Sequence, residues 1–188
     1  MRYPFVKFKL GTRYGTKGKL WKAGYHTGLD LLSAGYGGDG IVYPLYTGRV
    51  MRVATNDKSY GNYVLIKHAD GYITLYAHLK AIYVKMNMVV NEQTALGAEG
   101  ATGNASGRHL HIEVHKGSYN YPAVIDPLEF IKGGIETEKM ITIRLNGVVK
   151  TVSAIEKGGC NYIKLQDLRD GKIAIGYDAA NKLPTVDV

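Results

Sequence analysis

The sequence has few of the features that would cross-link a chain or anchor it in a membrane. Among 188 residues there is one cysteine, Cys160, so no disulfide can form within the chain. The fold must therefore be stabilised by its core and by any metal that it binds. No stretch is long and apolar enough to span a bilayer. The first residues, MRYPFVKFKL, lack the apolar stretch and small-residue cleavage site of a secretory signal, so we expect a soluble chain made in the cytoplasm without membrane insertion.

Proline is also scarce, with 5 residues, whereas glycine (24) and tyrosine (15) are abundant. The chain is 45% apolar and 21% charged, a balance that excludes a disordered protein. Many glycines together with β-branched and aromatic residues favour strands joined by tight turns. The composition therefore predicts a mostly β fold.

Local patterns predict several of these strands in the first part of the chain. Residues 41–54 and 62–68 are expected to be strands, and Ala69-Asp70-Gly71 indicates a hairpin into YITLYAH. HLHIEVHK alternates, with Leu110, Ile112 and Val114 on one face and histidines with Glu113 on the other. IDPLEFI is expected to form a short closing helix.

A change of composition after KGGIETE predicts a domain boundary. We expect a catalytic domain at residues 1–133 and a small mixed α+β domain at residues 138–188. In the second, Asn146-Gly147 indicates a hairpin, YIKLQDLRDG suits a short helix, and KIAIGYDAANKLPTVDV suits two strands about a turn. About 50 residues fold alone only marginally, so this domain is expected to pack on the first or on a copy of itself, as a possible homodimer.

Positive charge lies mostly in the first domain. Residues 1–134 carry 16 Lys+Arg and 9 Asp+Glu, a net of +7 out of +8 for the whole chain. Such a field favours anionic partners, namely nucleic acid, anionic lipid or an anionic cell wall, although it can also serve solubility alone. Because the charge is diffuse and no basic–aromatic binding motif is present, we do not expect nucleic acid to be the partner.

Histidine and aspartate occur at three separated places in patterns that suit a zinc site. They are His26 and Asp30 in YHTGLD, His78 in YAHL, and His109 and His111 in HLH. Two imidazoles and one carboxylate can hold zinc tetrahedrally and leave a fourth position for water. The two remaining histidines can move protons, so the five residues together predict a hydrolytic metal site.

Each piece of this pattern has an ordinary alternative. With six histidines and 16 acidic residues, roughly half an instance of the HxxxD spacing is expected by chance. The histidines of HLH point to the same side of a strand, where they can instead form a histidine-rich solvated or core face. His78 can be a structural histidine that donates to a backbone carbonyl, the role that we expect for His68 and His115.

Together, these segments resemble the lysostaphin/LytM-type zinc endopeptidases of peptidoglycan. YHTGLDL resembles the HxxxD segment of that family, GNYVLIKHADGYITLYAHL its central hairpin, and GATGNASGRHLHIEV its glycine-rich approach to HxH. IDPLEFI is similar to the segment that ends the catalytic domain. The resemblance covers about residues 1–132 and keeps the order and spacing of the family motifs.

The resemblance implies an antiparallel β-sheet catalytic domain with loops that wall a narrow substrate groove. It implies one zinc ion held by His26, Asp30 and His111, and it makes His78 and His109 an unliganded catalytic pair. We expect His109 to act as the base that takes the proton of the water. His78 would stabilise the oxyanion or pass a proton to the leaving amine, and the sequence does not decide which histidine has which role.

The implied substrate is the stem peptide or cross-bridge of peptidoglycan. Tyr25, beside His26, is a candidate for lining the groove, with ordinary packing as the alternative. Arg108 stands where the family commonly has a small residue or proline, and it can attract a substrate carboxylate or remain a solvated side chain.

Without an export signal, a wall hydrolase needs another way out of the cell. A phage endolysin, made in the host cytoplasm and released to the wall through a holin, fits this expectation. The alternative is a catalytically inactive wall-binding or amidase-activating protein of the same fold.

Overall fold

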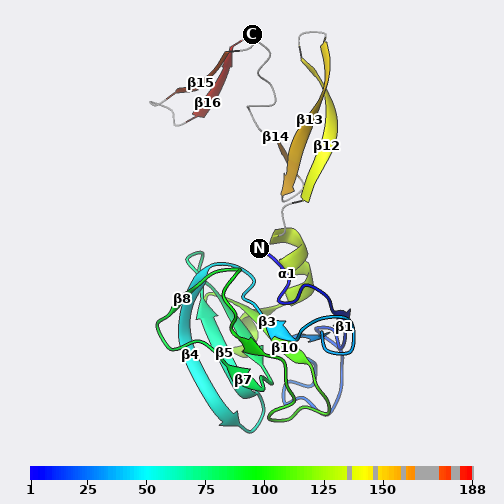
Figure 1. Ribbon diagram of the computed structural model, residues 1–188, viewed down its shortest axis with the longest axis vertical. Coiled ribbons are helices and arrows are strands. Elements are labelled where there is room, and N and C mark those ends of the chain that lie inside the picture. Colours follow the sequence, from blue (N-terminus) through cyan, green and yellow to red (C-terminus); the bar gives the residue numbers. More distant parts are fainter. Residues whose placement is uncertain (135–136, 146–147, 158–159, 164–173, 179–182, 188) are drawn as a thin grey trace. The chain divides into compact units, whose positions relative to one another are not determined.

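The first 134 residues are built around one antiparallel sheet. The computed structural model describes residues 1–134, 137–145, 148–157, 160–163, 174–178 and 183–187 (Figure 1), and contacts within the chain divide it into two compact units, Met1–Gly134 and Ile135–Val188. In the first unit the strand order is β1-β2-β10-β6-β5-β4-β8, and β11 pairs with β10. The strands are β1 (Lys9–Leu10), β2 (Leu29–Leu32), β4 (Gly48–Asp57), β5 (Gly61–Lys67), β6 (Tyr72–Ala77), β8 (Val89–Val90), β10 (Leu110–Lys116) and β11 (Val124–Ile125).

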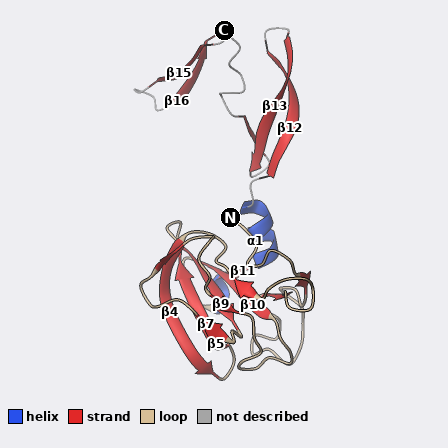
Figure 2. Ribbon diagram, in the orientation of Figure 1, coloured by secondary structure: helices blue, strands red, loops and turns tan. Residues whose placement is uncertain are grey.

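A smaller antiparallel sheet and two short helices complete this unit. The small sheet has the order β3-β9-β7, with β3 (Ile41–Val42), β7 (Ala81–Ile82) and β9 (Gly97–Ala98). The helices are η1 (Tyr121–Ala123) and α1 (Pro127–Gly134). Figure 2 shows long loops beside the sheet, and these loops supply much of the site described below.

Both faces of β10, near the centre of the sheet, are buried. In β10, Leu110, Ile112 and Val114 lie on one face and are inaccessible to solvent. His111 and Glu113 point to the other face and are also buried, with exposed fractions of 5% and 0%. The alternation predicted from HLHIEVHK is therefore confirmed, but its polar face is covered rather than solvated.

The central hairpin provides the apolar part of that covered face. Strands β5 and β6 pair through Leu65 and Leu75, and Glu113 of β10 stands opposite Leu75. Cross-strand neighbours share a face, so the polar side chains of β10 border an apolar cluster that includes Leu65, Leu75 and Ala77. This pairing confirms the hairpin predicted at Ala69-Asp70-Gly71.

Helix α1 confirms the predicted closing helix in IDPLEFI. Asp126 caps its first turn, because Asp126 Oδ1 accepts a hydrogen bond from the backbone nitrogen of Leu128 at 2.8 Å. Pro127 occupies the first helical position, where its missing N–H costs nothing. Leu128 and Ile131 bury the inner side of the helix. Figure 1 shows the N-terminus of the chain beside α1.

One expectation for local structure in the first unit was wrong. The strand expected at residues 41–54 is broken into β3 and β4, and Pro44, which has no N–H to donate, lies in the gap. In the HTGLD segment β2 begins at Leu29, so His26 and Gly28 lie in the loop before this strand and Asp30 lies within it.

The second unit is antiparallel in its described residues. One sheet has the order β12-β13-β14, with β12 (Thr137–Leu145), β13 (Val148–Lys157) and β14 (Cys160–Ile163), and β15 (Ala174–Asp178) pairs with β16 (Leu183–Asp187). The pairing of β12 with β13 fits the predicted hairpin, whose turn Asn146-Gly147 lies outside the described residues. The pairing of β15 with β16 fits the two strands predicted in KIAIGYDAANKLPTVDV.

A helix was expected over YIKLQDLRDG. This expectation is wrong for the first two residues, because Tyr162 and Ile163 lie in β14. The rest of the segment lies outside the described residues. The predicted homodimer through this unit stays a prediction. Among the described residues, no helix combines the length and apolar character needed to cross a bilayer.

Candidate metal centre and active site

Three of the five residues singled out in the sequence come together through the register of two strand pairs. Strand β10 pairs with β2 so that His111 stands directly opposite Asp30. On its other side β10 pairs with β6, and His111 stands opposite Ala77, the residue before His78. The backbone at His78 has a φ of 62°, a left-handed turn that ends β6 at this point.

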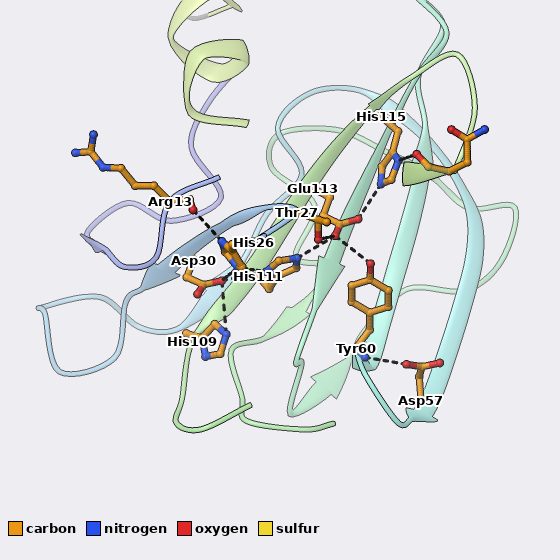
Figure 3. A network of polar contacts seen from close by, with 11 residues as sticks. Arg13, His26, Thr27, Asp30, Asp57, Tyr60, His109, His111, Glu113 and His115 are labelled. Atoms are coloured by element: carbon orange, nitrogen blue, oxygen red, sulfur yellow. Dashed lines mark hydrogen bonds and ion pairs between the residues drawn. The ribbon is translucent and has the colours of Figure 1, made fainter. Parts of the chain in front are cut away.

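The ring of His26 joins this group from the loop before β2. Its backbone is held by a hydrogen bond from the His26 nitrogen to the Thr16 carbonyl at 2.8 Å. Figure 3 shows the side chains of His26, Asp30, His109 and His111 turned toward one another.

His26, Asp30 and His111 offer ligand atoms at the spacing that a tetrahedral zinc requires. His26 Nε2 lies 3.0 Å from His111 Nδ1 and 3.1 Å from Asp30 Oδ1, and His111 Nδ1 lies 3.0 Å from the same oxygen. Ligand atoms at about 2.0 Å from a tetrahedral zinc would be roughly 3.3 Å apart. The donor set and its spacing therefore fit zinc with little rearrangement.

The other ring nitrogen of each ligand histidine indicates which nitrogen is available for metal. His26 Nδ1 lies 3.2 Å from the Arg13 carbonyl oxygen, and His111 Nε2 lies 3.2 Å from Glu113 Oε1. Because both of these oxygens only accept hydrogen bonds, each nitrogen facing them carries its proton. His26 then presents Nε2 and His111 presents Nδ1, the same two atoms that lie beside Asp30.

His78 and His109 are oriented in the same way but outside this triangle. His78 Nδ1 lies 2.8 Å from the Thr102 carbonyl oxygen, and His109 Nδ1 lies 2.8 Å from the Gly107 carbonyl oxygen. The two rings are 4.8 Å apart, and His109 Nε2 lies 3.7 Å from Asp30 Oδ1. Each ring therefore has Nε2 free of a backbone partner, which is the atom needed for proton transfer.

Hydrogen bonds control the charges of the candidate ligand residues Asp30 and His111, and burial controls that of His78. Burial opposes ionisation of Asp30, but hydrogen bonds from His111 and His26 outweigh it and hold the pKa of Asp30 well below its usual range. Burial likewise disfavours the charged form of His111, yet hydrogen bonds to Asp30 and Glu113 raise its pKa to about 9. Burial lowers the pKa of His78 to about 4, so this ring is neutral at pH 7.

A groove of about 790 Å³ opens over these residues. Its described lining includes all five of them and three loop segments, Leu20–Ala23, Lys58–Tyr60 and Gly103–Ser106. A Cβ on Gly103 would lie 2.3 Å from the Gly61 nitrogen, and both glycines have positive φ angles of 71° and 65°. Only glycine allows this close approach, which brings the two backbone segments of the wall together.

The structure places Tyr25 and Arg108 outside the described lining of this groove. Tyr25 packs edge-on against Tyr14, with ring centroids 5.8 Å apart. Arg108 Nε lies 3.3 Å from Oε2 of the buried Glu99. Their predicted contacts with substrate stay predictions, and in this structure both side chains make contacts within the protein.

Sequence reasoning did not assign functions to several residues at the site. Trp21 lies in the groove with its ring 5.2 Å from that of His26, and nothing in the local pattern indicates it. Thr27, Tyr60 and Glu113 form a polar cluster behind His111 (Figure 3). The alternation of HLHIEVHK did place Glu113 on the histidine face, which was the available signal.

The comparison with protein families decides the relationship of this chain. The family model for peptidase family M23 matches residues 24–124, more than half of the chain and a span that contains all five site residues. The chain belongs to peptidase family M23. Proteins of the M23 family are zinc-dependent, in agreement with the donor set found here.

Individual M23 relatives agree with this relationship. The catalytic domain of lysostaphin from Staphylococcus simulans is 26% identical with a TM-score of 0.60, and the match covers 66% of this chain and 92% of that one. The peptidoglycan DD-endopeptidase ShyA of Vibrio cholerae is 42% identical over 73 residues, which are 38% of this chain. The murein hydrolase activator NlpD of Escherichia coli is 31% identical over 125 residues, 63% of this chain.

The similarity to whole relatives is limited in extent. The matches cover only 17% of ShyA and 31% of NlpD. What the chain shares with them is thus the M23 domain.

Proposed function

We propose that this chain is a zinc metalloendopeptidase that hydrolyses peptide bonds in the stem peptide or cross-bridge of bacterial peptidoglycan. The observation that carries the proposal is the triangle of His26 Nε2, Asp30 Oδ1 and His111 Nδ1, with edges of 3.0–3.1 Å at the base of a groove. A three-residue donor set leaves a coordination position open, as catalytic zinc sites do and structural zinc sites do not.

The remaining histidines supply the proton transfers. When bound, zinc polarises a carbonyl as a Lewis acid and lowers the pKa of a water molecule toward neutrality. His109 takes the proton of the attacking water through Nε2, while its Nδ1 stays on the Gly107 carbonyl. His78, whose ring is 4.8 Å away, carries its one proton on Nδ1 toward the Thr102 carbonyl, so its Nε2 must first receive a proton, for which the water is the source, before it stabilises the oxyanion or gives that proton to the leaving amine. These two roles can be exchanged between the rings.

The groove and the charge of the first unit suit such a substrate. The groove has a volume of about 790 Å³, and part of its lining is Gly103–Ser106, a segment of mostly small residues. Such a groove can accept an extended peptide with small side chains. The net charge of +7 on residues 1–134 favours adsorption to an anionic wall.

The decisive experiment is hydrolysis of purified peptidoglycans that differ in cross-bridge chemistry, followed by mass spectrometry of the released fragments. The zinc-loaded chain should release peptides with new amino and carboxyl ends, and chelator-treated protein should not until zinc is restored. The absence of any new peptide end in all substrates, with zinc bound at one equivalent, would exclude the endopeptidase.

An amidase-activating or wall-binding protein is the second candidate function, because the similarity to NlpD covers 63% of the chain. An activator should bind peptidoglycan and release nothing alone, yet stimulate a separate amidase. The intact set of five residues favours the enzyme, since binding alone does not require a second pair of histidines whose Nε2 atoms have no backbone partner.

A further inference from the structure

Behind the metal centre lies a buried carboxylate to which the hydrolysis described above assigns no role. Glu113 is inaccessible to solvent and stands on β10 opposite Leu75, at the edge of an apolar cluster. A buried charge is costly unless it is paired and hydrogen-bonded. A carboxylate at this position therefore needs a reason other than packing, because an apolar side chain would fill the same space without that cost.

Four side chains surround the Glu113 carboxylate and satisfy it (Figure 3). Oε1 accepts hydrogen bonds from Thr27 Oγ1 at 2.5 Å, from Tyr60 Oη at 2.9 Å and from His111 Nε2 at 3.2 Å. Oε2 faces His115 Nε2 at 2.8 Å. These partners come from the loop before β2, from the turn between β4 and β5, and from β10 itself.

The contact with His111 bears directly on the metal centre. A neutral imidazole has one N–H, and the carboxylate requires that it be on Nε2, so the lone pair is left on Nδ1. Nδ1 is the atom that lies 3.0 Å from both His26 Nε2 and Asp30 Oδ1. Without the carboxylate, the ring can carry its proton on Nδ1 or rotate, and in both cases the donor atom is lost.

Glu113 also connects His111 to the segment that carries the other two ligands, His26 and Asp30. Thr27 follows His26 directly, and its hydroxyl donates to the same oxygen as His111 Nε2. One carboxylate therefore holds the HTGLD segment and the HLH strand in a common position. Hydrogen bonds of this kind behind metal ligands commonly set both ring orientation and ligand basicity.

We propose that Glu113 is a positioning residue for the metal centre, which holds His111 in the tautomer and orientation that present Nδ1 to zinc and ties the Thr27 segment to it. This inference rests on the proposed zinc site. Glu113 does not touch the substrate or the reacting atoms.

The test compares Glu113→Gln with Glu99→Gln in the full chain. Glu99 is a matched control because it is equally inaccessible to solvent and hydrogen-bonded, to the backbone nitrogens of Ser33 and Ala34 and to Arg108, without contact to a metal ligand. Two quantities are measured: zinc affinity, by competition with a chromophoric chelator, and the ring-nitrogen chemical shifts of His111 in ¹⁵N-labelled, metal-free protein at about pH 10, above its raised pKa of about 9, where the ring is neutral and has a single tautomeric proton.

Glu113→Gln is expected to weaken zinc binding by about 10- to 100-fold and to move the His111 ring-nitrogen shifts, because a neutral amide holds the Nε2 proton less firmly. Glu99→Gln is expected to lower thermal stability and leave both readouts unchanged. Equal losses of zinc affinity in the two variants, or unchanged His111 shifts in Glu113→Gln, would overturn the proposal.

Thr27→Val provides a milder variant in case Glu113→Gln does not fold. It keeps the shape of the side chain and removes only the hydroxyl that donates to Glu113 Oε1. A smaller loss of zinc affinity in the same direction supports the proposal, and wild-type affinity contradicts it. If the wild-type chain bound no zinc, the proposed function would fail, whereas the His111 shifts would still decide whether Glu113 positions the ring.

Discussion

Replacement of Gly28 by alanine is the sharpest test of how tightly the HTGLD segment and the HLH strand are packed around the metal. Gly28 lies between the ligands His26 and Asp30 and against β10. A Cβ at this position would lie 2.4 Å from the Ile112 carbonyl oxygen, 2.6 Å from His111 Cε1 and 2.7 Å from His111 Nε2. All three distances are below the 3.0 Å that real Cβ atoms keep from other heavy atoms.

The size of the effect follows from these distances. To relieve the contact with the Ile112 carbonyl, the segments must separate by at least 0.6 Å, from 2.4 to 3.0 Å. Zinc–ligand distances tolerate changes of only about 0.2 Å, so His111 and Asp30 cannot both keep their positions. We expect Gly28→Ala to reduce zinc affinity by about 10- to 100-fold, and to destabilise the fold by about 1–3 kcal/mol as overpacked sites do.

Competition with a chelator measures the zinc affinity, and urea denaturation of the metal-free protein measures the stability. Gly107→Ala is the matched control, because Gly107 lies just before HLH and a Cβ there meets nothing within 4 Å. Zinc binding by Gly28→Ala as tight as that of the wild type and of Gly107→Ala would refute the reasoning from close approach.

The remaining predictions concern the metal centre and the route of release. His109→Ala should retain zinc and lose peptidoglycan hydrolysis, whereas Asp30→Asn should lose both. Metal analysis and mass spectrometry of wall fragments distinguish the two variants. Full turnover in zinc-bound His109→Ala would contradict the assignment of His109 as the base. Zinc affinity, measured by calorimetry, should rise about tenfold per pH unit up to about pH 9, because His111 must lose the proton that its raised pKa retains. The same proton on His111 adds to the free energy of unfolding of the metal-free protein, because the pKa of His111 is higher in the fold than in the unfolded chain. This stabilisation is complete below pH 6.5 and is lost as the pH rises through 9, so urea titrations should show a less stable protein at pH 10 than at pH 6. Zinc at a thousandfold excess over its Kd should stabilise the native state by about 4 kcal/mol, so the unfolding temperature measured by calorimetry should fall when zinc is removed. An unchanged unfolding temperature would exclude zinc binding to the native state. Finally, the predicted release route can be tested by cytoplasmic expression in a sensitive host, where lysis should follow only when a holin is co-expressed.

The sequence by itself determined the chemical types and the order of the site residues. HxxxD and HxH are short-range patterns, and strand alternation places His109, His111 and Glu113 on one face without knowledge of the rest of the fold. The hairpin at Ala69-Asp70-Gly71 and the capped helix in IDPLEFI were likewise predictable, because their hydrogen bonds join residues close in sequence.

Only the tertiary structure decided which atoms meet. The register between β10 and β2, two strands about 80 residues apart, places His111 opposite Asp30, and no local pattern encodes that pairing. The same holds for the Glu113 contacts with Thr27 and Tyr60, and for Arg108, which reaches the buried Glu99 rather than the described lining of the groove. Such contacts depend on how distant segments pack, since a side chain's partner is set by the whole fold and its residue type alone leaves that partner open.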